Sequence, residues 1–513
     1  MLPHAKRWLY LVHRWAGVVL CAFFAMWFVS GVVMMYVGYP KLTATERLEH
    51  MAPLRTAAIA LEPAQALRAA GIDGKPLSDL RLAVASGGRA VYLVLPQGAP
   101  RRGPATVVDA STGQVLRGVD AAWATASAQA FAGTPGSAPR YLGSLDEDAF
   151  THSRALDAHR PLHRLALGDA ADTEVYVSGT TGEVVRDATR TERGWNYVGA
   201  WIHWLYPFRG NAFNAWWADI VNWLSIAGIV LTITGTVVGI MRWRFTRRYK
   251  SGSRSPYRGF MMRWHHVSGL LFAAVTLTWI FSGLMSMNPW KVFDSGAPAL
   301  RTQAMHGGPL LLPAQPASVQ ALLAAASPNT RELRWVRTAG HTLVQAASPT
   351  GAPALLDATT AQPHAMDKQQ LLAAAGHLLP DPVARSETLS EYDMHYYSRA
   401  AHTMTGGGDK PLPVLRVVFA DAHATWVHID PHTGAVLDKS DTHRRASRWL
   451  FALLHSWDWG PLLARRPLWD VVLVVLSLGG ALLSFTGVVV GWRRLSYQWR
   501  GKGTAVKLAA KKC

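Results

Sequence analysis

Four long apolar runs dominate the pattern of hydrophobic and polar positions along the chain. They cover residues 15–37, 216–241, 264–287 and 468–492. A helix needs about 20 mostly apolar residues to cross the hydrocarbon core of a bilayer, and each run meets that length. Tryptophan and tyrosine gather at the run ends, as is typical of a membrane–water interface. The pattern predicts four transmembrane helices. The first run is too long for a signal peptide, so we expect it to be retained.

The two long stretches between the runs, residues 38–215 and 288–467, have a different pattern. Short segments of helical periodicity precede runs that are typical of β-strands. The helical segments are Pro63–Ala70, Ser318–Ala326 and Asp367–Leu378, and the strand-like runs include Leu80–Ala85, Ala90–Leu95, Leu415–Ala420 and Thr425–Ile429. Glycine closes several of the intervening turns, as hairpins require. We expect each stretch to fold as an insert of about two small α+β units.

The two halves of the chain repeat with an offset of 252 residues. The matched pairs include His13 with His265, His203 with His455, Ser30-Gly31 with Ser282-Gly283, and Thr234-Gly235 with Thr486-Gly487. Internal repeats of one membrane chain normally pack about a pseudo-two-fold axis. Both halves enter and leave the membrane in the same sense, so the axis should follow the membrane normal. The predicted fold is a mainly α transmembrane bundle of four helices, in two pseudo-two-fold-related pairs, with two α+β inserts.

The charge distribution orients this bundle. The chain carries 52 Lys and Arg residues against 33 Asp and Glu, a net charge of +19. Residues 1–15, 242–263 and 493–513 hold 18 of the basic residues and no acidic one, so the rest of the chain is nearly neutral. Basic residues beside apolar runs stay in the cytoplasm. We therefore expect cytoplasmic termini and inserts on the opposite side, and no nucleic acid as a partner. Two cysteines exclude a disulfide-built secreted module.

These patterns divide the chain into eight segments. The expected boundaries are 1–37 for the N-terminus and first span, 38–194 for the first insert, 195–243 for an interfacial helix and the second span, 244–263 for a cytoplasmic loop, 264–287 for the third span, 288–446 for the second insert, 447–494 for an interfacial helix and the fourth span, and 495–513 for a cytoplasmic tail.

Four histidines carry the candidate chemistry, because histidine beside a bilayer is costly and marks function. His13 and His265 lie at the cytoplasmic ends of two spans, and His203 and His455 precede the other two on the far side. The repeat sets each pair face to face. Two facing imidazoles can hold a metal or the iron of a b-type haem. No Cys-x-x-Cys-His sequence is present, which excludes covalent attachment. His266 is an alternative to His265, although the repeat favours His265.

Other residues have weaker claims to a role. Arg14, Arg209 and Arg263 are candidate partners for haem propionates, and the repeated glycines provide close approach for either a macrocycle or a neighbouring helix. Met35 and Met287 match across the halves as axial ligands or, more simply, as packing residues. Among the histidines of the inserts, His395 is the candidate for contact with a substrate. Asp219 and Asp470 begin two spans, where the helix dipole stabilises a negatively charged carboxylate.

Together these residues resemble the PepSY-associated transmembrane family over nearly the whole chain. The resemblance rests on Val12-His13-Arg14-Trp15-x-Gly17, on Trp264-His265-His266-x-x-Gly269, on Leu412-Pro-Val-Leu-Arg-Val417 and on Trp426-Val-His-Ile-Asp-Pro-His-Thr-Gly434. Family members include dihaem inner-membrane reductases of ferric siderophores. The resemblance implies two haem b groups per chain with the four matched histidines as ligands, a bacterial inner-membrane location, PepSY-like periplasmic inserts and a role in iron release.

Three functions follow from these expectations. The first is a haem-dependent ferric-siderophore reductase that takes electrons from a separate cytoplasmic reductase or a quinol, because the cytoplasmic segments are too short to fold a flavin or nicotinamide domain. The second is a non-catalytic PepSY membrane protein that binds or regulates a periplasmic partner such as a protease. The third, a permease for the iron complex, is disfavoured because the runs show no intramembrane carboxylate and no broken helix.

Overall fold

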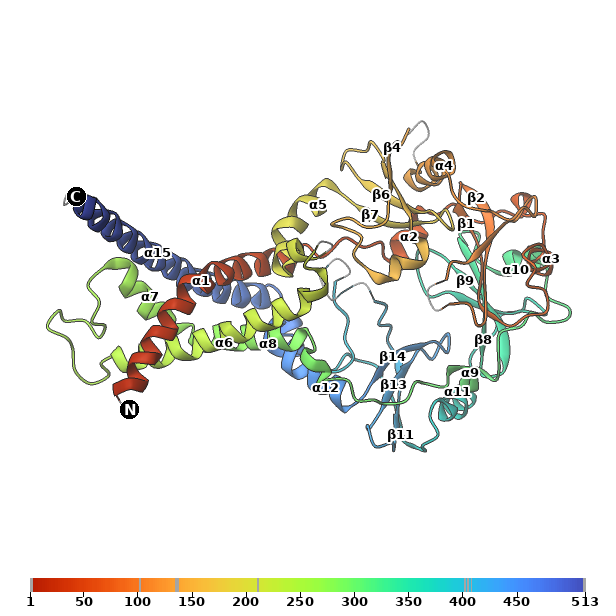
Figure 1. Cartoon of the computed structure of the whole chain (residues 1–513). Helices are drawn as coiled ribbons and strands as arrows, with labels where there is room; N and C mark the ends of the chain where they lie inside the picture. The colour runs from red at the N-terminus through yellow and green to blue at the C-terminus, as the bar shows by residue number, and fades with distance from the viewer. Residues whose placement is uncertain are drawn as a thin grey trace.

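The computed structural model describes residues 3–100, 103–133, 138–209, 212–400, 403, 406 and 408–510. A bundle of long helices forms one end of the molecule and β-sheets form the other (Figure 1). Both chain ends lie at the far end of the bundle, which we name the terminal side (Figure 1). The end of the bundle that faces the sheets is named the insert side.

Within the described part of the chain, three helices are long and apolar enough to cross a membrane. They contain α1 (Pro3–Tyr36), α6 (Trp217–Arg242) and α15 (Leu468–Ala510). A fourth span is possible if α7 (Phe260–Leu271) and α8 (Ala273–Ser286) are counted together. Helix α1 packs against α15 and α6, α7 packs against α15, and α6 packs against α8.

The expectation of an unbroken helix over 264–287 is wrong, because α7 and α8 meet at an angle of 68°. The break falls at Phe272, whose ring lies over the backbone of Gly479 in α15. A Cβ atom on Gly479 would stand 2.1 Å from that ring, so glycine is what admits the phenylalanine. The equivalent position in α1 is Leu20, and α1 continues through it.

The first units of the two inserts share one six-stranded sheet. Its order is β10-β9-β8-β1-β2-β3. The strands are β1 (Leu77–Ser86), β2 (Arg89–Pro96), β3 (Thr106–Asp109), β8 (Glu332–Thr338), β9 (His341–Ala347) and β10 (Ala354–Asp357). The inserts join where β1 pairs antiparallel with β8, with Leu80 opposite Trp335 and Ala83 opposite Glu332. Helices α3 (Pro63–Ala69) and α10 (Val319–Ala325) contribute to the apolar core of this sheet.

The hairpin between β1 and β2 shows how local sequence sets the sheet. Gly87 and Gly88 both have positive φ, at 59° and 70°. A two-residue turn with both central residues in that region matches the twist of the strands it joins, and glycine adopts it without steric cost. The alternation of apolar and polar residues in β1 then places Leu80 and Leu82 in the core.

Each insert also has a separate four-stranded antiparallel sheet. The strand orders are β4-β5-β6-β7 and β11-β12-β13-β14. The strands are β4 (Arg140–Leu145), β5 (Leu162–Ala166), β6 (Glu174–Ser178), β7 (Val184–Ala188), β11 (Val383–Leu389), β12 (Val414–Phe419), β13 (Trp426–Ile429) and β14 (Val436–Ser440). Helix α4 (Ala121–Ala132) shares an apolar core with the first sheet, and α11 (Lys368–Ala375) does so with the second.

Short helices lead each four-stranded sheet back to the bundle and carry two of the candidate histidines. The first path runs through α5 (Arg190–Asn196) and a π-turn, η3 (Tyr197–Trp201); the second runs through α12 (Thr442–Arg448), the π-turn η8 (Trp449–Leu453) and α13 (Leu454–Ser456). The remaining short helices are α2 (Ala44–His50), η1 (Thr56–Ala58), η2 (Arg154–His159), η4 (Tyr206–Phe208), η5 (Asn214–Trp216), η6 (Pro289–Lys291), α9 (Thr302–His306), η7 (Gly376–Leu378) and α14 (Gly460–Leu463).

Candidate functional site

His13 and His265 meet near the terminal side of the bundle, on α1 and α7. Their ring centres are 6.3 Å apart and the ring planes are inclined by 30°. Nδ1 of His13 lies 3.4 Å from the carbonyl oxygen of Leu231, and Nδ1 of His265 lies 3.3 Å from that of Leu483. The two carbonyls are themselves 252 residues apart in sequence, so both rings are oriented in the same way.

His203 and His455 meet on the insert side, just after the two π-turns. Their ring centres are 6.2 Å apart and the ring planes are inclined by 79°. Nδ1 of His203 is hydrogen-bonded to Oγ of Ser30 at 2.9 Å, and Nδ1 of His455 to Oγ of Ser282 at 3.0 Å. The sequence repeat therefore brings together both of the pairs that it predicted.

The free nitrogen of each ring is the one that a ligand would use. Among the described residues, the side-chain hydrogen bonds of all four imidazoles are made through Nδ1, which leaves Nε2 available. An imidazole nitrogen binds a transition metal at about 2.0–2.1 Å and the ring centre lies roughly 1.2 Å behind it, so two imidazoles on opposite sides of one metal have centres about 6.4 Å apart. The two observed separations lie within about 0.2 Å of that value.

Burial keeps the insert-side pair in the form that ligates. His203 and His455 lie outside the membrane-spanning helices, and desolvation lowers the pKa of His203 to about 3 and that of His455 to about 4. Both imidazoles are therefore neutral near pH 7, and only the neutral ring has a lone pair on Nε2. Each pair supplies two ligands, which is the number that a porphyrin-bound iron requires.

Glycines make room for the histidine rings. A Cβ atom on Gly235 would lie 2.6 Å from Cε1 of His13, and one on Gly487 would lie 3.2 Å from Cε1 of His265. On the insert side the corresponding distances are longer, 3.7 Å from Gly31 to His203 and 3.8 Å from Gly283 to His455. The repeated glycines thus contact the imidazoles directly, a role that sequence reasoning had not assigned to them.

A cavity of about 510 Å³ opens beside His203 and His455. Its size falls within the range of about 300–1,000 Å³ typical of cofactor pockets. The lining is mostly aromatic and apolar and includes Trp27, Trp279, Met35 and Met287, so both matched methionines face this space. The cavity is therefore suited to a large flat apolar group held between two imidazoles.

One arginine at this cavity was missed by the sequence analysis. Arg399 lines the cavity and pairs with the buried carboxylate of Asp458. Tyr397 donates a 2.7 Å hydrogen bond to the same carboxylate, and Arg448 donates to the backbone carbonyl of Asp458 at 3.1 Å. Arg399 comes from the long loop between β11 and β12, where no repeat or motif drew attention to it. Only the folding of the second insert over the bundle brings it here.

The expected arginines lie in different surroundings. Arg14 and Arg263 are exposed on the terminal side, and neither forms a hydrogen bond or ion pair with the described residues. Arg209 donates to the hydroxyl of Tyr206 at 2.9 Å and lies over the ring of Trp217 at 5.2 Å. Tyr206 and Trp217 both line the cavity, so Arg209 is close to its edge.

His266, the alternative to His265, is occupied at both ring nitrogens. Nδ1 is hydrogen-bonded to Oγ of Ser255 at 2.7 Å and Nε2 lies 2.9 Å from the carbonyl oxygen of Gly239. Its ring therefore joins the loop after α6 to the helix end and has no nitrogen free. This geometry favours His265 as the partner of His13.

The remaining candidates, His395, Asp219 and Asp470, are not among the residues that line the cavity. His395 packs against Trp426 at 5.3 Å between ring centres, at the second four-stranded sheet. Asp219 and Asp470 occupy the first turns of α6 and α15 as expected, and Asp470 pairs with Arg466 at 2.6 Å. No cluster of three or more His, Cys, Asp or Glu side chains that could hold a bare metal ion occurs among the described residues.

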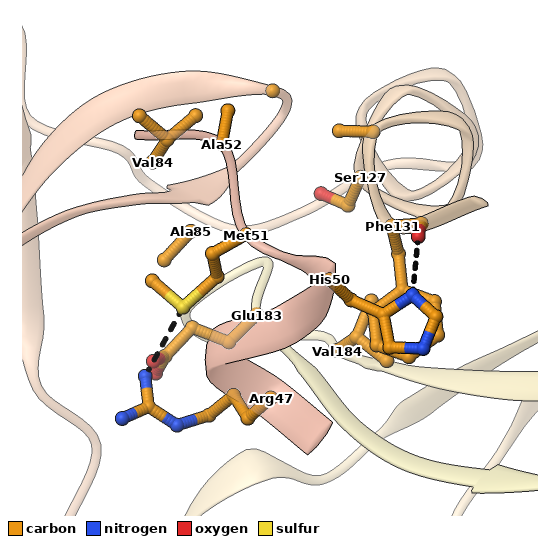
Figure 2. Close-up of a pocket in the computed structure, with 12 residues that line it drawn as sticks. Arg47, His50, Met51, Ala52, Val84, Ala85, Ser127, Phe131, Glu183 and Val184 are labelled. Atoms are coloured by element: carbon orange, nitrogen blue, oxygen red, sulfur yellow. Dashed lines mark hydrogen bonds between the residues drawn. The ribbon is translucent and has the colours of Figure 1, made fainter. Parts of the chain in front are cut away.

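A second pocket lies between α2, α4 and the hairpins of the first insert, and none of the four paired histidines lines it (Figure 2). Its volume is about 30 Å³, which is room for a water molecule or two. Arg47, His50 and Glu183 reach it, but His50 is hydrogen-bonded to the carbonyl of Phe131 and stacks on that ring (Figure 2). We interpret this pocket as a packing gap between units.

The long apolar helices and their inserted sheets define an integral membrane protein. The chain belongs to the family described as the PepSY-associated TM region, whose model matches residues 10–494. This confirms the family resemblance drawn from the histidine and insert motifs. Among curated proteins, none matches the chain at a significant level.

Proposed function

We propose that the protein is a haem b-containing reductase of the bacterial inner membrane, which moves electrons across the bilayer to a ferric siderophore or another ferric chelate. The observation that carries this proposal is the separation of the two histidine pairs, 6.3 and 6.2 Å between ring centres. One such pair has many explanations in a helical bundle. Two pairs at opposite ends of the same bundle, each with Nδ1 bound and Nε2 free, favour a chain of two redox groups.

In this proposal each pair holds one haem, and the bundle is four helices in two pseudo-two-fold-related pairs. When bound, haem iron would supply one-electron chemistry, with two histidines of this chain as the protein ligands of each iron. Ser30 and Ser282 fix the orientation of the insert-side imidazoles, as outer hydrogen-bond partners of metal-bound histidines do. The carbonyls of Leu231 and Leu483 do the same on the terminal side.

Arginines would neutralise the propionates of each group. On the insert side these are Arg399, which lines the cavity, and Arg209 at its edge. On the terminal side they are the exposed Arg14, which directly follows His13 in α1, and Arg263, two residues before His265 in α7. The mostly apolar lining of the cavity would surround a porphyrin on the insert side with apolar and aromatic side chains.

The orientation follows from the basic residues of the terminal side, which we place in the cytoplasm. The inserts then lie in the periplasm, where the ferric chelate docks. A separate cytoplasmic reductase or a quinol delivers the electrons, and membrane lipid surrounds the helices. Fe(II) binds hard oxygen ligands more weakly than Fe(III) does, so reduction of the chelate releases its iron.

The test is optical. Protein purified from haem-replete cells should show a Soret band and two haem b groups per chain in a reduced-minus-oxidised spectrum. The double variant His13→Ala/His265→Ala should lose one haem and keep the other, and His203→Ala/His455→Ala should lose the other one. His266→Ala is the control and should keep both. A colourless, stable protein that co-purifies with a hydrolase would instead support the non-catalytic alternative.

A further inference from the structure

The loop between α6 and α7 is an ordered basic surface. Within residues 242–263 the chain has eight basic residues, all exposed and none in an ion pair with a described carboxylate: Arg242, Arg244, Arg247, Arg248, Lys250, Arg254, Arg258 and Arg263. We name residues 242–263 the basic loop. Its neighbours along the chain add no compensating charge, because the sequence has no Asp or Glu between residues 220 and 293.

The basic loop has a defined conformation of its own. The backbone N–H of Arg244 donates to the carbonyl of Arg254 at 3.1 Å, and that of Tyr249 donates to Ser253 at 2.9 Å, so the loop folds back on itself. The guanidinium of Arg244 lies 4.0 Å from the ring centre of Tyr249, whose hydroxyl donates to the carbonyl of Arg242 at 2.9 Å. Gly252, with φ of 75°, closes the turn.

The loop is also fixed to the histidine pair of the terminal side. Oγ of Ser255 is hydrogen-bonded to Nδ1 of His266 at 2.7 Å, and the ring of Tyr257 stands edge-on to His266 at 5.3 Å. His266 directly follows His265 in α7. On the other side Arg242 donates to the hydroxyl of Tyr10, which lies one turn of α1 before His13. The basic loop is thereby held against both helices that carry the pair.

The orientation of the protein in the membrane explains why the loop is positively charged. It does not explain why the loop is folded or why it is hydrogen-bonded to α1 and α7. Basic residues keep a loop in the cytoplasm whether or not the loop is folded. A folded, uniformly positive surface beside a redox site has a further use, because complementary charge steers a protein partner and raises its association rate by about 10–10³-fold.

We propose that the basic loop is the docking surface for a small soluble electron carrier with an acidic rim around its cofactor. This inference rests on the proposed function, and it specifies the electron donor as a protein of that charge. His13 and His265 would hold the ferric haem that accepts one electron from the reduced carrier docked on this surface. The carrier departs oxidised, and no proton or group is transferred.

The test uses the full chain in nanodiscs of neutral lipid, with reduced flavodoxin of net negative charge as the probe. Stopped-flow absorbance at the Soret band should give a second-order rate that falls steeply with salt. The variant Arg247→Glu/Arg248→Glu should reduce that rate about 10-fold or more at low salt. At about 1 M salt, where the Debye length is about 3 Å, the variant and the original chain should converge.

Two controls separate the possible outcomes. Arg68→Glu/Lys75→Glu makes the same charge change on exposed residues of the first insert and should leave the rate unchanged. Full reduction by dithionite, read as an end point, should give equal haem content in every variant. A chain without a Soret band refutes the proposed function itself. If the chain holds both haems but flavodoxin reduces the Arg247→Glu/Arg248→Glu variant as fast as the original chain, only the docking surface is refuted. Loss of thermal stabilisation by anionic phosphatidylglycerol in the variant, with unchanged kinetics, would assign the loop to lipid headgroups instead.

Discussion

At the scale of single residues, the histidine pairs depend on what lies behind each ring. Serine hydroxyls or backbone carbonyls occupy Nδ1, and glycines leave space for Cε1. These neighbours matter as much as the histidines do, because the hydrogen bond at Nδ1 fixes the orientation of the ring. A ring held by a different hydrogen bond would not present Nε2 to a ligand. The two pairs should differ in how well they tolerate a larger residue at the glycine, because a Cβ atom would crowd the ring of His13 but not that of His203.

The substitution Gly235→Ala tests this difference. Its methyl group would stand 2.6 Å from Cε1 of His13, which is too close for any non-bonded pair, so the ring must move. We expect the variant to lose the terminal-side haem while it keeps the other, as measured by haem stoichiometry and the reduced difference spectrum. Gly31→Ala is the matched control, because its methyl group would be 3.7 Å from His203. Equal haem content in the two variants would contradict the proposed arrangement.

At the scale of secondary-structure elements, the second four-stranded sheet contains a row of charged and polar residues across its strands. Glu387 of β11, Arg416 of β12, His428 of β13 and Asp438 of β14 are successive partners in the register. Arg416 donates from Nε to Nε2 of His428 at 2.8 Å and pairs with Glu387 at 3.2 Å. The fully buried imidazole therefore has to remain neutral to accept this bond.

This row predicts a loss of stability in acid. Burial, together with the nearby charge of Arg416, lowers the pKa of His428 to about 3. The unfolded chain binds a proton near pH 6.5 and the folded chain does not, so stability is complete above about pH 6.5 and falls as the pH decreases. Between pH 7.5 and 5 the loss from this residue is about 2 kcal/mol.

Thermal unfolding of the full chain in detergent at those two pH values measures the effect. His428→Gln keeps an acceptor for Arg416 but cannot titrate, so its unfolding midpoint should change less with pH than that of the original chain. His377→Gln, at a position outside the row, is the control and should leave the pH dependence as it was. An unchanged pH dependence in His428→Gln would show that other groups dominate.

At the scale of the whole molecule, charge and shape are segregated along one axis. The described parts of the basic segments without acidic residues, 3–15, 242–263 and 493–510, lie at the terminal side, and the sheets lie at the opposite end (Figure 1). A protein with this asymmetry has one stable orientation in a bilayer whose cytoplasmic face attracts basic residues. The proposed direction of electron flow, from the basic loop to the inserts, depends on that orientation.

Cysteine labelling in spheroplasts tests the orientation. We expect Ser348→Cys, in the second insert, to react with a membrane-impermeant maleimide from outside, and Ser251→Cys, in the basic loop, to react only after lysis. The background is set by a chain in which Cys21 and Cys513 are replaced by serine. Labelling of Ser251→Cys in intact spheroplasts would invert the proposed topology.

Sequence reasoning reached the features that depend on local pattern or on the repeat. Three of the four predicted spans, the insert hairpins and the meeting of His13 with His265 all follow from periodicity, turn chemistry and one offset. It failed where the outcome depends on a tertiary contact. The break at Phe272 depends on Gly479 in a distant helix, and Arg399 reaches the cavity only because a loop of the second insert folds over the bundle. The expectation that no span is broken, which we used as an argument against a permease, was wrong for the same reason.

The antiparallel pairing of β1 with β8 has a register that is symmetric with respect to the two halves of the chain. Leu80 faces Trp335 and Ala83 faces Glu332, and subtraction of 252 turns those partners into positions 83 and 80. The edge of one half is thus complementary to a copy of itself. A gene encoding only the first half would yield a polypeptide with that edge uncovered, and two such polypeptides would associate through it. Duplication and fusion would then make permanent, within one chain, a partnership first formed between two.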